Sequence, residues 1–159
     1  MKWITPFFNK IKYTFKRFYR ILNVKKRSEF VWKDLIKYNQ ESGWRFGQFE
    51  TEKRIETAFK VYDNYVLDFN YTVENNKLEI SVIIIRSFEE EKTNDLLVLA
   101  SHFNSLLHFG VVKVSVKYNY VEYTYSGDLI TYMLYSGEID TDSIRHFNIA
   151  KDVFWSFKT

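Results

Sequence analysis

Apolar residues near the start of the chain recur every three or four positions, which is the spacing of one helical face. Phe8, Ile11, Phe15 and Leu22 belong to this face. Lysines and arginines fill the other faces, and no acidic residue precedes Glu29 to offset their repulsion. The pattern predicts a basic, amphipathic N-terminal helix.

A second helix is expected to begin after Ser28, whose hydroxyl is a good N-cap acceptor. Val31, Leu35 and Tyr38 then continue the helical spacing. The stretch Gly-Trp-Arg-Phe-Gly, residues 43–47, is predicted as a C-cap and an entry loop.

From Glu56 the apolar period changes to two, as in a half-buried strand. Asp63–Asn64 and Asn75–Asn76 are dipeptides that tolerate the left-handed backbone of a tight hairpin. Three runs of alternating residues separated by these turns predict a three-stranded antiparallel meander. Its inner row comprises Phe59, Val61, Tyr65, Leu67, Phe69, Tyr71, Val73, Leu78, Ile80, Val82 and Ile84.

Helical and strand patterns alternate again in the second half of the chain. An amphipathic helix follows Glu89–Glu91 and is stopped by Gly110. Period two returns in two or three strands, with Tyr118–Asn119 and Gly127–Asp128 as turns, and a last helix is capped by Thr141 or Asp142. The apolar helix face comprises Leu96, Leu99, Ala100, Phe103, Leu106 and Leu107, and the strand rows comprise Val112, Val114, Val116, Val121, Tyr123, Tyr125, Ile130, Tyr132 and Leu134.

This order of elements predicts an α+β fold in which helices pack on an antiparallel β-sheet. The sheet would hold the three-strand meander and two or three further strands. No repeat or linker divides the chain, so we expect a single domain over residues 28–159, preceded by the helix of residues 1–27.

Composition removes several functional classes. The 159 residues include no cysteine, which excludes disulfides, thiol nucleophiles and thiolate metal sites. No apolar run approaches the roughly 18–20 residues of a transmembrane helix, and basic residues interrupt any signal-peptide core. We expect a cytoplasmic location, with peripheral attachment to the inner face of the membrane left open.

The net charge of +3 hides a strong asymmetry. Residues 1–28 hold nine basic residues and no acid, whereas the remainder holds 14 basic and 20 acidic residues. The basic arm therefore packs on the acidic body or a second protomer, or lies on an anionic membrane surface. Nucleic acid is disfavoured, because phosphate contacts would leave the aromatic stripe uncovered. The arm residues expected to make these contacts are Trp3, Phe7, Phe8, Lys12, Phe15, Lys16, Arg17, Phe18 and Arg20.

Residues 96–110, Leu-Leu-Val-Leu-Ala-Ser-His-Phe-Asn-Ser-Leu-Leu-His-Phe-Gly, resemble the middle helix of YbjN-type bacterial proteins. That helix carries an asparagine late in its length and runs into the next strand. The order of elements over residues 28–157 is likewise similar to the type III secretion chaperone-like fold. The resemblance implies a non-catalytic protein-interaction module that is often dimeric and needs no cofactor.

No catalytic or metal-binding constellation stands out. His102 and His108 are six positions apart, about 240° around a helix, and so do not face one site. No nucleophile motif, phosphate-binding glycine loop or calcium loop occurs. We therefore expect neither an enzyme nor a cofactor.

A cluster of tyrosines on the later strands is the remaining candidate for binding. Strand propensity alone explains tyrosines on a half-buried sheet, but outward-facing rings such as Tyr123 would anchor a protein partner. The expected partner surface comprises Phe103, Tyr120, Tyr123, Tyr125 and Tyr132. Partner binding is the favoured function, and membrane attachment through the arm is the alternative.

Overall fold

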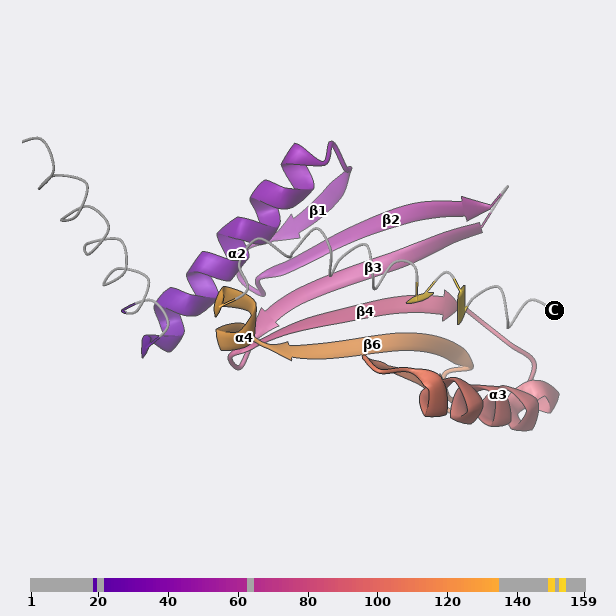
Figure 1. Ribbon diagram of the computed structural model, residues 1–159. Coiled ribbons are helices and arrows are strands. Elements are labelled where there is room, and N and C mark those ends of the chain that lie inside the picture. Colours follow the sequence, from indigo (N-terminus) through magenta and orange to yellow (C-terminus); the bar gives the residue numbers. More distant parts are fainter. Residues whose placement is uncertain (1–18, 20–21, 63–64, 135–148, 151, 154–159) are drawn as a thin grey trace, which may run out of the picture.

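A computed structural model describes residues 19, 22–62, 65–134, 149, 150, 152 and 153 (Figure 1). The chain has an α+β fold in which helices pack on an antiparallel sheet. Its elements are α2 (Val24–Glu41), β1 (Phe46–Phe49), β2 (Arg54–Tyr62), β3 (Tyr65–Glu74), β4 (Lys77–Ile85), a 3-10 turn (Glu90–Lys92), α3 (Thr93–Leu106), β5 (Val111–Ser115), β6 (Tyr120–Asp128) and α4 (Leu129–Leu134).

The sheet has six strands in the order β1-β2-β3-β4-β6-β5, with every neighbouring pair antiparallel. The predicted meander is confirmed as β2, β3 and β4. Asn75 and Asn76 both have positive φ, 48° and 65°, between the paired residues Glu74 and Lys77. This is the backbone of a two-residue hairpin turn, which asparagine adopts more readily than most residues.

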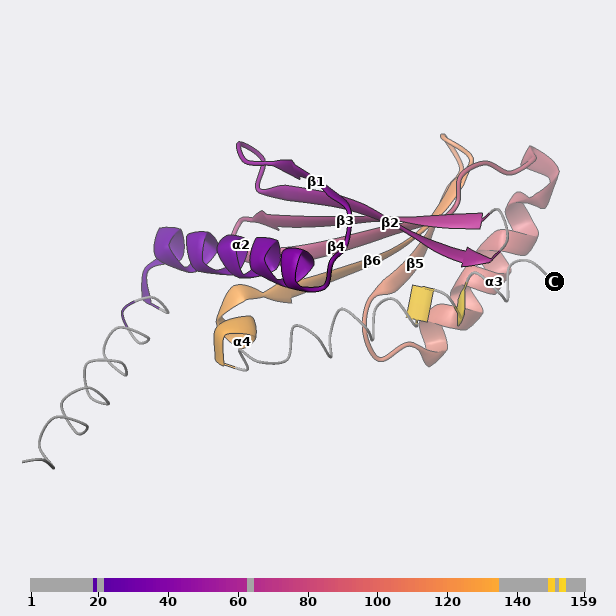
Figure 2. The same cartoon turned by 90° about the horizontal axis from the view of Figure 1, so that it is seen from above.

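One face of the sheet carries the core. Along β3, buried residues alternate with half-buried ones, as the period of two predicts. Leu67, Phe69, Tyr71 and Val73 face the core and are at most 4% exposed. Figure 2 shows α2 and α4 on the same side of the twisted sheet. The described helices leave the opposite face, which we call the open face, without cover.

Helix α2 begins earlier than the sequence suggested. Its N-cap is Asn23, whose side-chain oxygen accepts a hydrogen bond from the Lys26 amide at 3.0 Å. Ser28 lies inside the helix, so its assignment as the cap was wrong. Arg27 is buried, at 5% exposed, so a boundary between residues 27 and 28 falls within a packed helix.

Two other elements correct the prediction. Phe46 and Gly47, expected in the entry loop, belong to strand β1, which pairs with β2. The run from Ile130, expected as a third late strand, is helix α4. Asp128 decides this because its carboxylate accepts hydrogen bonds from the amides of Ile130 and Thr131 at 2.6 and 3.3 Å, which begins a helix instead of a hairpin.

The last part of the chain is described only at four positions. Ile149, Ala150, Asp152 and Val153 are helical, and Ala150 and Val153 belong to the core. The predicted Asp63–Asn64 turn and the predicted caps at 141 and 142 lie outside the described residues. Within the described part, no helix has both the length and the apolarity to cross a membrane.

Candidate functional site

Helix α3 is fixed to β5 through one asparagine. The Asn104 side chain donates to the Val112 carbonyl at 2.9 Å and accepts from the Val112 amide at 2.7 Å. On the inner side of the helix, Leu96 and Ala100 are buried in the core. The helix is therefore held rigidly beside the strand at one edge of the sheet.

Tyr123 locks the same region from β6. Its side chain is fully buried, and its hydroxyl donates to the Phe109 carbonyl at 3.2 Å. Burial raises the pKa of the Tyr123 hydroxyl well above its usual value. The ring occupies the space beside Gly110, where an added Cβ would come within 2.4 Å of the hydroxyl oxygen. The expectation that Tyr123 faces outward was therefore wrong.

The other residues of the expected partner surface are spread over the fold. Phe103, Tyr125 and Tyr132 are half-buried and pack against the core. The Tyr132 hydroxyl donates to the Asp34 carboxylate of α2 at 3.4 Å, and burial raises the pKa of that carboxyl group. Tyr120 is half-buried at the start of β6 and stacks on the exposed Tyr118. These tyrosines serve the fold and do not form one outward-facing patch.

Exposed apolar side chains instead gather on α3, β5 and the loops that flank β5. We call this region the α3–β5 surface. Val98 is 71% exposed and Leu106 is 62% exposed, although Leu106 was expected on the buried face. Val98 stands two positions from both Leu96 and Ala100, so the helical period alone places it opposite the core. The surface comprises Leu97, Val98, Leu106, Phe109, Val111, Val116 and Tyr118.

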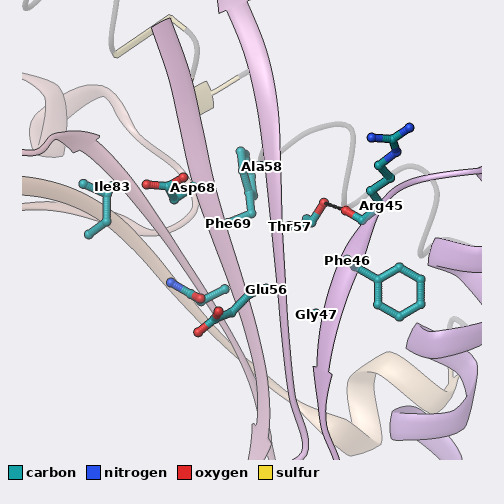
Figure 3. A pocket seen from close by; sticks show the side chains of 10 residues that line it. Arg45, Phe46, Gly47, Glu56, Thr57, Ala58, Asp68, Phe69 and Ile83 are labelled. Carbon is teal, nitrogen blue, oxygen red and sulfur yellow. Dashed lines mark hydrogen bonds between the residues drawn. The ribbon is translucent and has the colours of Figure 1, made fainter.

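A shallow hollow of about 640 Å³ lies at the other end of the sheet (Figure 3). It opens on the open face, where Gly47 pairs with Glu56 and Glu56 pairs with Asn70 across three strands. Ala58 and Asp68 form the next row. The hollow could not be foreseen from the sequence because it depends on β1, which was not predicted. Its lining residues are Arg45, Phe46, Gly47, Glu56, Thr57, Ala58, Asp68, Phe69, Asn70 and Ile83.

The residues expected to give the arm its contacts lie outside the described part of the chain. They are Trp3, Phe7, Phe8, Lys12, Phe15, Lys16, Arg17, Phe18 and Arg20. The described positions that follow them, Tyr19 and Leu22, show how exposed the apolar stripe is at its end. Leu22 is 68% exposed and Tyr19 is 59% exposed, so the body as described does not cover them.

The described residues contain no group of three or more His, Asp or Glu side chains that could hold a metal ion. His102, within α3, and His108, just after it, are both exposed. A scan of protein-family models and a search of curated proteins found no match to this chain. Function must therefore be inferred from the surfaces.

Proposed function

We propose that this protein is a non-catalytic protein-interaction module that binds a partner through the α3–β5 surface. The observation that carries this is the exposure of large apolar side chains there. Seven of the eleven exposed large apolar residues in the described part of the chain belong to it. Exposed apolar patches of this kind mark interaction sites in soluble proteins.

Helix α3 explains why a partner is needed. A helix that only covers a sheet has one apolar stripe and a polar outer side. Here Leu96 and Ala100 face the core while Leu97, Val98 and Leu106 face solvent. Covering one such side chain contributes roughly 1.5–3 kcal/mol, so burying several would support a stable complex.

The element order agrees with the proposed relation to the type III secretion chaperone-like fold. Helix α2, the meander, α3, the strands β5 and β6 and the helical residues 149, 150, 152 and 153 follow in the order on which that resemblance rests, with strand β1 and helix α4 as additions to it. We extend the proposal to this fold family and to a second copy of the chain as one form of the partner.

Site-specific photocrosslinking tests the proposal. A photoreactive phenylalanine analogue is placed at Val98 or Leu106 in the full chain, with Lys37 on α2 as the control position because its side chain is 68% exposed. We expect adducts from the two α3 positions and none from Lys37. The adduct mass distinguishes a second copy from a different protein. Equal labelling at all three positions, or none at any, would contradict the proposal.

The uncovered stripe at Tyr19 and Leu22 favours membrane attachment as a second function. The helix predicted from the sequence for residues 1–27 would carry further aromatic residues on the same face, with basic residues flanking them, as in helices that lie in a membrane interface. Anionic headgroups attract each basic residue near the surface by about 1 kcal/mol.

Vesicle co-sedimentation tests this second function. The variant Lys12→Glu/Lys16→Glu is compared with Lys33→Glu/Lys37→Glu, which changes the net charge equally but on α2. We expect the arm variant alone to lose binding to phosphatidylserine vesicles by at least about tenfold. Equal loss in both variants would show only a general charge effect. The structure also directs truncations to residue 22 or earlier, because a cut after residue 27 removes the Asn23 cap.

A further inference from the structure

The two edge strands of the sheet, β1 and β5, differ in whether their outer backbone groups already have hydrogen-bond partners. At the β5 edge, the Asn104 side chain occupies both the amide and the carbonyl of Val112. An incoming strand would have to displace these hydrogen bonds. Lys113 also places a charge on this strand, a feature that discourages strand pairing. The β5 edge is therefore closed to an added strand at Val112.

The β1 edge is free of both features. Its four residues, Phe46–Phe49, are uncharged and pair with β2 alone. Among the residues that the structure describes, no side chain or loop makes a hydrogen bond to the outer backbone of β1. Unpaired amide and carbonyl groups on a strand edge are a template for another extended chain.

Gly47 opens a path from this edge into the hollow. The residue lies on the open face of β1, directly beside Glu56 of β2. Gly47 has no side chain of its own, and the Phe49 ring lies beside it, with its nearest atom 3.4 Å from where a Cβ would be. A group that passes over Gly47 toward the Glu56 carboxylate would therefore run along this ring. Asn70 follows Glu56 in the same row. Asp68 lies in the next row (Figure 3). Asp68 already pairs with Arg86 at 2.6 Å, so the hollow offers the Glu56 carboxylate and the Asn70 amide to a group entering over Gly47.

Strand spacing determines which side chain would fit. Adjacent strands lie about 4.8 Å apart, so Glu56 is roughly 10 Å from a strand added beside β1. Only a long side chain reaches that far, and the carboxylate requires a hydrogen-bond donor. We propose that the β1 edge binds an extended segment of a partner protein, with a lysine or arginine opposite Gly47 that reaches Glu56. This rests on the proposed function of protein binding but uses a different surface.

The neighbouring charges leave room for such a cation. Arg54 donates to both Glu52 and Glu56, so one guanidinium serves two carboxylates. Its contact with Glu56 uses Oε1, which leaves Oε2 for another donor. Arg45 lines the hollow where β1 begins, and its guanidinium points away from Glu56 (Figure 3).

The core-facing side of β1 determines which residues should flank the basic one in the bound partner segment. Phe46 is half-buried and packs against the core from the face opposite Gly47. Residues flanking the basic one in an added strand point to this face, because side chains alternate along a strand. The expected segment therefore has apolar residues on both sides of one lysine or arginine.

Peptide selection identifies the preferred segment without assuming it. Random twelve-residue peptides displayed on phage are selected against the immobilised full-length protein. Selected peptides are then synthesised and titrated into the ¹⁵N-labelled full chain. We expect a central lysine or arginine between apolar residues, with the largest amide shifts at Gly47, Gln48 and Glu56.

Three variants test the geometry. Gly47→Val closes the path, and the site tolerates a Cβ because the nearest atom, on Phe49, lies at 3.4 Å. Glu56→Gln removes the charge. Glu79→Gln is the matched control on the open face of β4, outside the hollow. We expect the first two variants to weaken peptide binding about tenfold, a free-energy change of about 1.4 kcal/mol, and the control to leave it unchanged.

Several outcomes would overturn the inference. These are selection of peptides without a basic residue, unchanged binding by Gly47→Val, or amide shifts confined to Val98 and Leu106. A dimer of the full chain that Gly47→Val dissociates would show that a second copy occupies the edge instead. Failure of this inference is distinguished from failure of the proposed function by the Val98 adducts. If the peptide tests fail while Val98 still gives adducts, the proposed function stands.

Discussion

Asn104 and Val112 hold each other through two hydrogen bonds between one side-chain amide and one backbone residue. The amide of Asn104 imitates the peptide group of an adjacent strand. A side chain of helix α3 thereby completes the edge of the sheet at Val112, which follows Asn104 by eight positions in the sequence. The relationship fixes the helix and closes the strand edge at once.

Replacement of this asparagine should be costly. Asn104→Ala leaves the amide and carbonyl of Val112 without partners, so we expect the free energy of unfolding to fall by about 2 kcal/mol. Ser105→Ala is the control, because the Ser105 hydroxyl bonds only the nearby His102 carbonyl on the exposed side of α3. Urea unfolding monitored by circular dichroism measures both. Similar losses in the two variants would show that the amide contact contributes little.

Alanine substitutions at two glycines distinguish the cost of backbone strain from the cost of steric conflict. Gly110 and Gly43 have φ values of 72° and 68°, so alanine is strained at either position. At Gly110 an added Cβ would also lie 2.4 Å from the Tyr123 hydroxyl oxygen, whereas at Gly43 nothing lies within 4 Å. We expect Gly43→Ala to cost about 1 kcal/mol and Gly110→Ala at least about 2 kcal/mol more. Thermal unfolding of both variants measures these losses of stability. Equal losses would contradict the expected steric conflict at Gly110.

The start of α2 can be tested with a similar pair. Asn23→Ala removes the acceptor of the Lys26 amide, and we expect a loss of about 1 kcal/mol. Ser28→Ala should cost nothing or stabilise slightly, because Ser28 lies within the helix and alanine is the better helix former there. Chemical unfolding distinguishes them. A larger loss for Ser28→Ala would mean that the helix begins later.

Stability should fall in alkali because of a buried tyrosine. Burial raises the pKa of the Tyr123 hydroxyl above its ordinary value of about 10, so the folded state holds this proton more tightly than the unfolded state. The contribution is complete below pH 10 and is lost as the pH rises above it. Tyr123→Phe should lower stability by about 1 kcal/mol at pH 7, through the lost bond to Phe109, yet flatten the alkaline decline.

Unfolding titrations between pH 7 and 11 test this sign. Tyr65→Phe provides a second case, because burial also raises the pKa of Tyr65, whose hydroxyl bonds the Ile84 carbonyl. An alkaline decline as steep in the double variant as in the parent protein would contradict the assignment.

Short-range sequence patterns were sufficient to predict much of the fold. The period of two and the paired asparagines at 75 and 76 define the meander because both act within a few residues. The four-residue strand β1 was missed because a short run containing Gly47 has no clear period, and only its pairing with β2 makes it a strand. At α4, the alternation of Ile130 and Tyr132 resembled a strand, but the cap from Asp128 outweighed it.

The candidate sites were harder to foresee. Tyr123 is a strand residue whose sequence neighbours do not show whether its ring is covered. Its burial depends on Gly110, which is 13 positions away and leaves room for the ring. Exposure of Val98 followed from helical spacing and could have been predicted. The hollow could not, because it joins residues of four strands that only the folded sheet brings together.

The hairpin turn between β3 and β4 also joins two distant parts of the chain. The Asn76 carbonyl accepts from the Leu129 amide at 3.1 Å, and the Asn76 side chain donates to Asp128 at 2.9 Å. Hairpin tips are ordinarily chosen for inserting tags or for new chain termini. Here the tip is the support on which α4 begins. An insertion after Asn75 would therefore disturb a helix more than fifty residues away, and protein engineering should leave this turn intact.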